Sequence, residues 1–411
     1  MDRLTDFAQQ SFFQLHKFDY SWDHGPSIVS PARRLAFDIL RKVGRGGYAA
    51  DLLAAGAEPL DARDAALASE IVFGVLRYQA QLDFLIGRYS GRGVRKLDFE
   101  VLLALRLGVY QLRYLDRVPP HAAVSQSVEL VKTMGFHSAA GFANAVLRKV
   151  SREPVAWPDR AVELSHPEWL LARWDRQFGP EVTPLIAGAN LLPPETYLRV
   201  PQGRAIPAGV SLEPTAVPGC YHLVAGEADG FRIQDIGAQS IVPLLDLSPG
   251  QSLLDLCAAP GNKTAQALES GVRVVACDFR AKRVATLKQL GVDVVHLDGT
   301  RPLPFGRRFD RVLLDAPCSG TGTLARNPEI KWRLLPSDIQ QLHGRQVALL
   351  RNALQVLAPK DVLVYSTCSL EREENDGVIE AVGSPPPAHT MHRIPGIQRG
   401  DGFFAAVIRS R

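Results

Sequence analysis

The chain has 411 residues, of which 46% are hydrophobic and 22% charged, proportions typical of a folded globular protein with room for two or three domains. Its apolar runs are shorter than the roughly 18 residues of a membrane span, and its five cysteines form no CxxC pair, which argues against a disulfide framework and a zinc site. The net charge of +4 is uneven, because residues 31–150 hold 17 Lys and Arg against 11 Asp and Glu.

The first 30 residues have no basic stretch followed by an apolar one, so they are not a signal peptide, and we interpret 1–30 as a mobile leader. Unpaired cysteines are typical of a cytoplasmic protein, where thiols stay reduced. The basic surplus of residues 31–150 indicates either a polyanion partner such as nucleic acid or simply a solvated helical surface.

Residues 31–150 have the apolar spacing of helices throughout. Pro31 follows Ser30, a good N-cap, and Leu35, Ile39 and Leu40 recur at helical spacing. Further helices are predicted at 62–78, 81–89, 99–115, 122–134 and 139–150, with Gly and Pro between them. Because no strand-like alternation interrupts these runs, the sequence predicts an all-α domain of about six helices over 31–150.

Residues 151–240 change character. Proline is frequent, and short apolar runs at 197–200 and 221–224 replace the long helices. This pattern predicts a small α+β connecting element over 151–240. A helix is expected to open near Phe231, ahead of the first strand of the next domain.

From Ser252 onward, strand and helix alternate, which predicts a mostly parallel sheet covered on both faces. Strands are expected at 252–257, 272–277, 292–297, 311–314, 362–365 and 403–408, with a long helix at 336–357. Four strands end in acids, namely Asp255, Asp278, Asp298 and Asp315. Ligands of such sheets bind beyond the carboxyl ends of the strands, so residues 241–411 are expected to form an α/β domain with a crevice along that edge.

The turn after the first of these strands, DLCAAPGNKT at 255–264, is a predicted ligand site. Small residues and Gly261 allow the backbone to approach a ligand at the N-terminus of the next helix. Asp278 follows the second strand, where an acid accepts the hydroxyl groups of a ribose. The turn matches neither GxGxxG nor GxxxxGK[ST], which favours a nucleoside with a charged, non-phosphate tail. The alternative is that these acids only cap helices.

Two thiols, Cys318 and Cys368, each lie at the end of a predicted strand beside small polar residues. Both are therefore expected to face the same crevice. A reactive thiolate needs an exposed, electropositive site, which Lys263 and nearby helix N-termini would supply. A redox pair is the alternative interpretation. The remaining cysteines have the pattern of buried structural residues: Cys220, Cys257 and Cys277.

A family resemblance is carried first by the helical part of the chain. LRLGVYQLRYL at 105–115, VPPHAAVSQSVEL at 118–130 and FANAVLR at 142–148 resemble the NusB-like RNA-binding helical domain. The resemblance implies that residues 31–150 bind RNA.

A more specific resemblance lies in the α/β part. CAAPGNKT at 257–264, VLLDAPCSGTGTLARNPEIKWR at 312–333 and VYSTCSLEREEN at 364–375 are similar to the signature motifs of the NOL1/NOP2/Sun family of S-adenosylmethionine-dependent RNA cytosine-5 methyltransferases. With the helical domain in front, residues 31–411 resemble the bacterial Sun-type branch, which implies a Rossmann-like methyltransferase sheet. One departure is Asn262, where the family has the second Gly of PGGK. Because Asn tolerates positive φ better than most residues, the turn is expected to survive.

The resemblance implies a role for four catalytic residues. Cys368 would be the nucleophile that attacks C6 of a cytosine, and Cys318 would assist release of the product. Asp315 would hydrogen-bond the N3/N4 edge of the base, and Lys263 would orient that acid or the base.

The resemblance also implies a cofactor and a substrate. S-adenosyl-L-methionine would bind to Cys257, Ala258, Ala259, Pro260, Gly261, Asn262, Lys263, Asp278, Asp298 and Asp315. The substrate would be ribosomal RNA, with 16S rRNA of the cytosine-967 type expected, and the target base would be single-stranded or flipped out. Arg326, Lys331 and Arg333 would grip backbone phosphates. No metal and no membrane are implied, and a monomer is the simplest expectation.

Three alternatives remain open at this point. DNA cytosine methyltransferases use the thiol of a Pro-Cys motif as nucleophile, a part that Cys318 would play here, although that scheme has no role for Cys368. Transfer RNA is another possible substrate. A catalytically silent RNA-binding assembly factor is the third alternative, against which the presence of both thiols, Asp315 and Lys263 argues.

Overall fold

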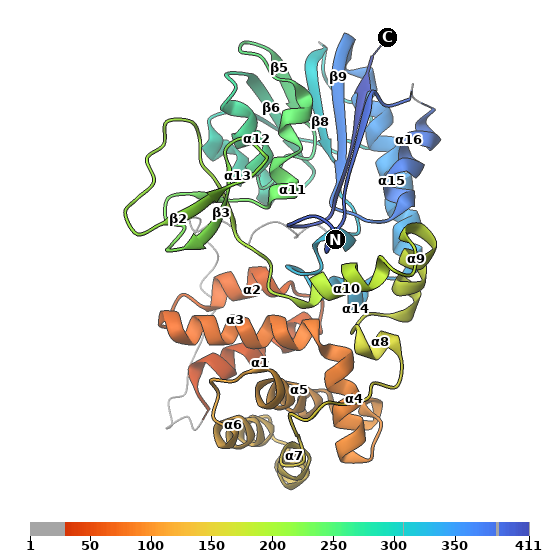
Figure 1. The fold of residues 1–411 in the computed structure, drawn as a ribbon. Coiled ribbons are helices and arrows are strands. Elements are labelled where there is room, and N and C mark those ends of the chain that lie inside the picture. Colours follow the sequence, from red (N-terminus) through yellow and green to blue (C-terminus); the bar gives the residue numbers. More distant parts are fainter. Residues whose placement is uncertain (1–28, 307, 384–385, 411) are drawn as a thin grey trace. The chain divides into compact units, whose positions relative to one another are not determined.

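The computed structural model describes residues 29–306, 308–383 and 386–410, so nearly all of the expected leader at 1–30 lies outside the described residues. The described chain divides into two compact units. We call residues 29–191 with 326–332 the helical unit, and residues 192–325 with 333–410 the sheet unit (Figure 1).

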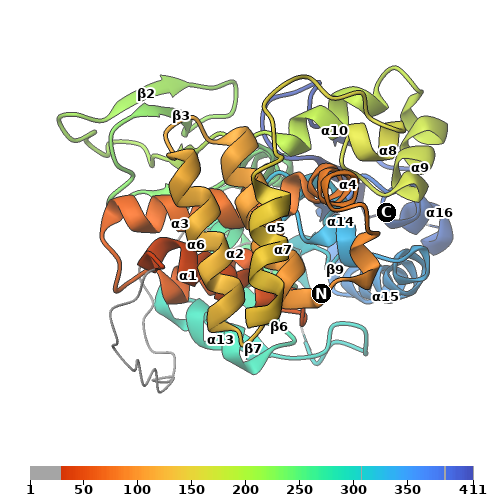
Figure 2. The ribbon, with the colours of Figure 1, turned by 90° about the horizontal axis from the view of Figure 1, so that it is seen from below.

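Residues 31–150 of the helical unit form seven α-helices, one more than expected, and no strand. The helices are α1 (Pro31–Val43), α2 (Ala49–Gly56), α3 (Ala62–Arg77), α4 (Gln79–Ser90), α5 (Phe99–Tyr114), α6 (Pro120–Thr133) and α7 (Ala140–Leu147), seen along a second direction in Figure 2. Three more follow before residue 191, namely α8 (Arg160–Glu163), α9 (Glu168–Phe178) and α10 (Thr183–Leu191), and segment 326–332 adds most of the short α14 (Ile330–Arg333). The additional helix is α2, whose sequence AADLLAAG has too few polar residues to show helical periodicity.

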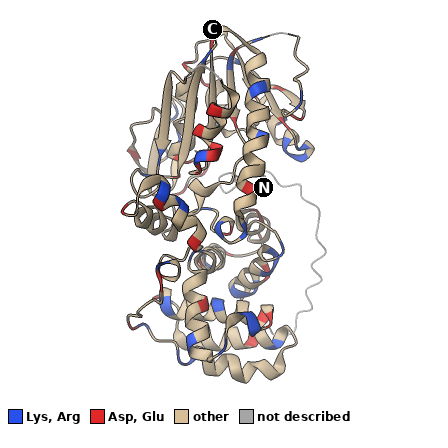
Figure 3. Ribbon diagram, turned by 90° about the vertical axis from the view of Figure 1, so that its right-hand side faces the viewer, with Lys and Arg blue, Asp and Glu red and all other residues tan. Residues whose placement is uncertain are grey.

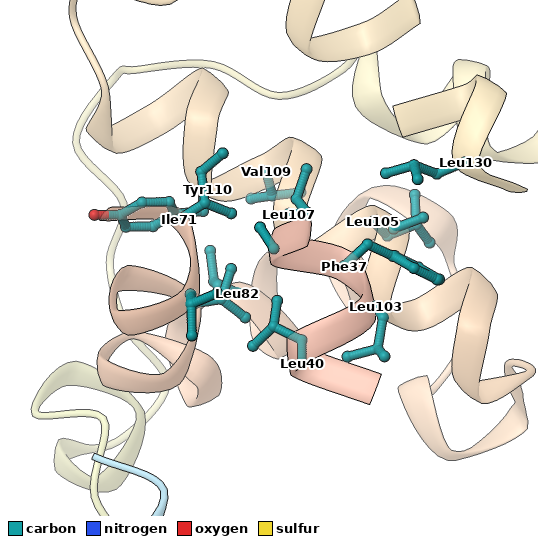
Figure 4. Close-up of a cluster of buried hydrophobic side chains, with 14 of the residues drawn as sticks. Phe37, Leu40, Ile71, Leu82, Leu103, Leu105, Leu107, Val109, Tyr110 and Leu130 are labelled. Atoms are coloured by element: carbon teal, nitrogen blue, oxygen red, sulfur yellow. The ribbon is translucent and has the colours of Figure 1, made fainter. Parts of the chain in front are cut away.

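The core of the helical unit is built around α5, whose side chains are buried around most of its circumference. Helices α1, α3, α4 and α6 supply the apolar side chains that surround it, as Figure 4 shows for Phe37, Leu40, Ile71, Leu82 and Leu130. Each fully buried side chain of this kind contributes about 1.5–3 kcal/mol of transfer free energy. A helix that is apolar on nearly all sides must be central, which explains why this one is wrapped by the others.

Charges of both signs are distributed along the helical unit (Figure 3). Several form ion pairs, for example Arg106, whose Nε and Nη2 atoms each donate to a carboxylate oxygen of Asp83 at 2.7 Å. Such pairs neutralise individual charges locally and leave the net basic surplus of residues 31–150 unchanged.

A segment from the second half of the sequence, 326–332, belongs to the helical unit. The Nζ atom of Lys331 donates to the carbonyl of Arg77 at 2.9 Å, and the indole nitrogen of Trp332 donates to the carbonyl of Leu76 at 2.7 Å. Lys331 is only 1% exposed. The expectation that Lys331 grips RNA phosphates is therefore wrong, because its ammonium group is buried at the C-terminal end of α3.

The sheet unit begins with a small antiparallel sheet of order β2-β3-β1-β4. Its strands are β1 (Tyr197–Arg199), β2 (Ser211–Pro214), β3 (Cys220–Ala225) and β4 (Arg232–Ile233), and the short apolar runs at 197–200 and 221–224 fall on β1 and β3. The expected helix starts at Ile236 rather than Phe231, because residues 232–233 pair as β4 and Asp235 caps the short α11 (Ile236–Gln239).

The main sheet has seven strands in the order β10-β11-β9-β8-β5-β6-β7. Five run parallel: β5 (Ser252–Asp255), β6 (Arg273–Asp278), β7 (Asp293–His296), β8 (Phe309–Asp315) and β9 (Leu357–Thr367). Two pair antiparallel at one side, β10 (His389–Arg393) and β11 (Phe403–Arg409). All six expected strands are confirmed. The seventh, β10, is a polar edge strand without apolar alternation, which is why the sequence did not indicate it.

Both faces of the main sheet are covered. Leu254 and Leu314 pack on one face, with side chains of α15 (Pro336–Gln355) and α16 (Asp376–Val382). Leu253 and Leu313 pack on the other face, which α12 (Asn262–Leu268) and α13 (Ala281–Leu287) cover. Successive residues of one strand thus enter different cores, and this explains why the central strands are continuous apolar runs.

Candidate active site

A pocket lies at the carboxyl edge of the parallel strands, where the sequence predicted a crevice. Residues that line it include Cys257, Asp278, Asp298, Asp315, Cys318 and Cys368. The two thiols and three of the four strand-end acids therefore face one space. They meet because parallel strands deliver their carboxyl ends to the same edge of a sheet.

The fourth acid, Asp255, is buried beneath this edge. One of its carboxylate oxygens accepts a hydrogen bond from the Thr264 hydroxyl at 2.6 Å. Its Oδ1 atom has no hydrogen-bond partner among the described residues. Burial raises the pKa of Asp255 to about 7, because removal from water disfavours the charged form.

The turn after β5 keeps its shape with Asn262 in place of the family's second Gly. The residue with positive φ is Gly261, at +107°, and a Cβ atom there would lie 2.7 Å from the side chain of Leu290. Asn262 is instead the first residue of α12, and its side-chain oxygen accepts a hydrogen bond from Arg232 at 3.0 Å. The expectation that the turn survives is confirmed, but tolerance of positive φ by Asn is not the reason.

Asp278 and Asp298 end β6 and follow β7. Asp278 accepts hydrogen bonds from the backbone nitrogens of Arg280 at 2.9 Å and Ala259 at 3.3 Å. Asp298 accepts from the backbone and the hydroxyl of Thr300, and these bonds lower the pKa of its carboxyl group. Both acids are thus held in place by local donors while they line the pocket.

The remaining expected cofactor residues fall into two groups. Ala259 lines the pocket with Cys257. The other five belong to the turn after β5 and the start of α12, and they do not line the pocket: Ala258, Pro260, Gly261, Asn262 and Lys263.

Several pocket residues escaped the sequence analysis, among them Phe279, Arg280, Arg283 and Arg345. Phe279 is 64% exposed, which is unusual for a large apolar side chain. Its position directly after the acid of β6 was the available signal. Arg345 lies on α15, far from any motif in the sequence, and nothing in the sequence indicated it.

Asp315 and Lys263 form an ion pair, with 2.5 Å between Nζ and Oδ2. The other oxygen of Asp315 accepts from the Ser366 hydroxyl at 2.8 Å. Lys263 is only 8% exposed, and its ammonium group also lies over the ring of Phe403. A carboxylate held on both oxygens has a fixed orientation, so Asp315 presents a defined hydrogen-bonding group to the pocket.

The two thiols of the pocket are in contact, with 3.3 Å between the Sγ atoms of Cys318 and Cys368. Cys318 is 4% exposed and Cys368 is partly exposed. The pKa of Cys318 is raised well above its ordinary value by the hydrogen bond with Cys368 and by burial. The expectation that both thiols face one crevice is confirmed.

Of the other three cysteines, Cys220 and Cys277 are buried, whereas Cys257 is partly exposed. Burial raises the pKa of Cys220 to about 11 and that of Cys277 to about 12. Cys257 also has its pKa raised by burial, although it reaches the pocket wall. Buried thiols such as those of Cys220 and Cys277 pack as small apolar side chains.

Known families and proteins are similar to this chain in sequence. Residues 242–398 match the family described as 16S rRNA methyltransferase RsmB/F, and residues 30–152 match the NusB family. Ribosomal RNA small subunit methyltransferase B of Klebsiella pneumoniae subsp. pneumoniae is 34% identical, over 92% of this chain and 98% of the relative. The probable ribosomal RNA small subunit methyltransferase B of Bacillus subtilis is 31% identical, over 85% of this chain and 87% of the relative.

The chain belongs to the ribosomal RNA small subunit methyltransferase B family. Methyltransferases of this family use S-adenosylmethionine to methylate ribosomal RNA. In the described part of this member, no helix is long and apolar enough to cross a membrane. The same residues contain no group of three or more His, Cys, Asp or Glu side chains that would hold a metal ion.

Solved structures share the fold of this family member. The crystal structure of PH0851 has a TM-score of 0.76 at 22% identity and covers 93% of this chain and 99% of its own. A methyltransferase homolog protein from Pyrococcus horikoshii has a TM-score of 0.53 at 26% identity, over 62% of this chain and 100% of its own. The expected architecture, a Rossmann-like methyltransferase sheet with a NusB-like helical part and a small α+β element, is confirmed.

Proposed function

We propose that this enzyme methylates C5 of a cytosine in 16S rRNA, of the cytosine-967 type, through a covalent bond between a cysteine Sγ and C6 of the base. The observation that carries the proposal is the pair of thiols with Sγ atoms 3.3 Å apart at the wall of the pocket, next to the Asp315–Lys263 ion pair. Methylation of a nitrogen or of a ribose oxygen has no use for two adjacent thiols.

The chemistry of cytosine explains why a thiol is needed. C5 is a poor nucleophile, and addition of a thiolate to C6 gives it enamine character, so that it attacks an electrophilic methyl group. A base then takes the C5 proton, and departure of the thiolate restores the aromatic ring. We assign the attack to Cys368 because its side chain is partly exposed at the pocket, whereas Cys318 is buried beside it. Cys318 assists the departure of the product.

Asp315 and Lys263 act on the base rather than on the methyl group in this proposal. Asp315, fixed by Ser366 and Lys263, hydrogen-bonds the N3/N4 edge of cytosine, and the positive charge of Lys263 offsets the negative charge that develops on the ring as C6 is attacked. Lys263 holds Asp315 in place and balances its charge.

The residues of the pocket fit S-adenosylmethionine, which when bound supplies a methyl group activated by a positively charged sulfonium. Asp278 would accept the ribose hydroxyls, and Asp298 would accept from a further polar group of the cofactor. The pocket wall carries three aspartates and three arginines, which suits a ligand with charges of both signs, such as the sulfonium and the carboxylate of this cofactor.

We further propose that the helical residues 31–150 bind the RNA, in the cytoplasm, while residues 241–411 carry out the reaction. The match to the NusB family and the basic surplus of this stretch support the assignment. The target cytosine must be unstacked, because C6 is not accessible within a stacked duplex.

The test is methyl transfer from labelled S-adenosylmethionine to unmethylated small-subunit rRNA, followed by denaturing electrophoresis. Cys368→Ala is expected to transfer no label and to form no protein–RNA adduct, while Cys318→Ala accumulates an adduct. Cys220→Ala, a buried thiol of the small sheet, is the control and should behave as wild type.

Two results would contradict this proposal. If Cys318→Ala abolishes the adduct while Cys368→Ala stays active, the nucleophile is Cys318, as in DNA cytosine methyltransferases. If the variant that lacks both thiols still methylates RNA, the reaction is not covalent.

A further inference from the structure

Each thiol of the pocket is followed in sequence by a serine, and both serines reach the same buried carboxylate. The hydroxyl of Ser369 donates to Oε2 of Glu374 at 2.5 Å, and the hydroxyl of Ser319 donates to the same oxygen. The two hydroxyl oxygens lie 3.0 Å apart. One atom of Glu374 thus joins the two loops that carry Cys318 and Cys368.

The second carboxylate oxygen of Glu374 also accepts two hydrogen bonds. Its Oε1 atom accepts from the backbone nitrogen of Ser319 at 2.8 Å and from Nε2 of Gln346 at 3.0 Å. Gln346, on α15, donates from the same nitrogen to the carbonyl of Pro317 at 2.9 Å. The carboxylate therefore ties together the thiol loop after β8, the thiol loop after β9 and a helix that covers the sheet.

This carboxylate is enclosed: Glu374 is 0% exposed. Burial raises its pKa, and the hydrogen bonds from Ser319, Ser369 and Gln346 act in the opposite direction. A buried polar network costs free energy unless all its members have partners, and here the carboxylate has four donors. Glu374 does not line the pocket, so it cannot touch a substrate there.

We propose that Glu374 is a positioning residue that clamps the two thiol-bearing loops together and keeps the Sγ atoms of Cys318 and Cys368 in contact. This inference rests on the proposed function, in which both thiols act on one base. The hydrogen bonds of Ser319 and Ser369 transmit the position of the carboxylate to the thiols one residue earlier in the chain.

Two substitutions distinguish positioning of the loops by hydrogen bonds from simple packing of the Glu374 side chain. Glu374→Ala removes both oxygens, so all four donors lose their hydrogen bonds to the carboxylate. Glu374→Gln keeps one oxygen for the two N–H donors, and its NH₂ group faces the two serine hydroxyls, which accept as well as donate. The glutamine variant should therefore keep the thiols together, and the alanine variant should let them separate.

The separation of the thiols is measurable without RNA or cofactor. A diazene oxidant takes two protons and two electrons from a pair of thiols in contact, forming one disulfide and one hydrazine. The rate of formation of the Cys318–Cys368 disulfide is followed by alkylation and peptide mass spectrometry. Wild type and Glu374→Gln are expected to form the disulfide at similar rates. Glu374→Ala is expected to form it at roughly one tenth of the wild-type rate or below, because small displacements of reacting atoms lower a rate by large factors.

The matched control is Glu380→Gln, which removes the charge of an exposed glutamate of α16 paired with Arg372. It should form the disulfide at the wild-type rate. If Glu374→Ala does not fold, the double variant Ser319→Ala with Ser369→Ala replaces it, since it removes only the two hydroxyls. A wild-type rate in the folded alanine variant, or in the double variant, overturns the clamp.

A second measurement separates the clamp from the proposed function. Methyl transfer by Glu374→Ala is expected to show a lower kcat with an unchanged KM for S-adenosylmethionine, and Glu374→Gln should restore most of the kcat. If the disulfide slows but wild type makes no 5-methylcytosine, the clamp stands and the proposed reaction fails. If the disulfide rate is unchanged, the clamp fails whatever the reaction is.

Discussion

Gly322 offers a direct test of how closely the loops of the active site pack. A Cβ atom at this position would lie 2.3 Å from the carbonyl oxygen of Gly402 and 2.8 Å from that of Cys368. Ordinary contact begins near 3.4 Å, so in Gly322→Ala the Gly402 carbonyl must retreat by about 1 Å. Both obstacles are backbone atoms, which no side-chain rotation relieves.

The retreat has an energetic consequence that the structure allows us to estimate. Gly322 donates its N–H to the Cys368 carbonyl at 2.9 Å and accepts from the Gly402 nitrogen at 2.7 Å. Weakening both bonds costs about 1 kcal/mol each, and overpacking costs about 1–3 kcal/mol. We expect Gly322→Ala to lower the free energy of unfolding of the sheet unit by about 3–5 kcal/mol in denaturant titrations. Methyl transfer should fall roughly 10- to 100-fold, because the Cys368 loop moves.

Gly344→Ala on α15 is the matched control, since a Cβ atom there meets nothing within 4 Å. Ala is about 1 kcal/mol more favourable than Gly within a helix, so this variant should be slightly more stable than wild type and fully active. If Gly322→Ala proves as stable and as active as Gly344→Ala, the loops around Gly322 do not pack as closely as the structure shows.

Three further predictions concern other parts of the chain. Burial lowers the pKa of His166 well below 6.5, so only the unfolded chain takes up its proton; stability should fall as the pH drops below about 6.5, by at most ~1.4 kcal/mol per pH unit. His166→Gln should make the free energy of unfolding, measured in urea titrations, less dependent on pH. An unchanged dependence would show that His166 is not its cause. Asp278→Asn should weaken binding of S-adenosylhomocysteine about tenfold or more in calorimetry, through loss of a charged acceptor; an unchanged affinity would remove Asp278 from the cofactor site. Arg311 donates to the Leu245 carbonyl at 2.7 Å and to Asp361 at 2.8 Å, so Arg311→Lys should lower the free energy of unfolding by about 1–3 kcal/mol, and equal stability would show that the forked geometry is dispensable.

The position of the site could be predicted because it follows from a general property of parallel sheets. Apolar runs that end in Asp278, Asp315 and Cys368 indicated strands, and the carboxyl ends of such strands must meet at one edge. Thiols 50 positions apart were therefore expected together, and the structure brings their Sγ atoms to 3.3 Å. The roles of these residues stay predictions until variants are measured.

What the sequence did not indicate depends on contacts between distant positions. Lys331 has the local pattern of an exposed cation, and only the carbonyl of Arg77, 254 positions away, explains its burial. Glu374 lies in the charged run EREEND at 371–376, whose pattern is that of a solvated segment, yet its donors lie up to 55 positions away in the chain. No local pattern distinguishes such residues, because their environment is created by the tertiary fold.

The most direct test of the central claim is the identity of the methylated nucleoside. Small-subunit rRNA labelled from S-adenosylmethionine by this enzyme would be digested to nucleosides and separated by chromatography. The account predicts that all the label migrates as 5-methylcytidine and that Cys368→Ala yields none. Label in any other nucleoside, or 5-methylcytidine formed at the wild-type rate by Cys368→Ala, would contradict it.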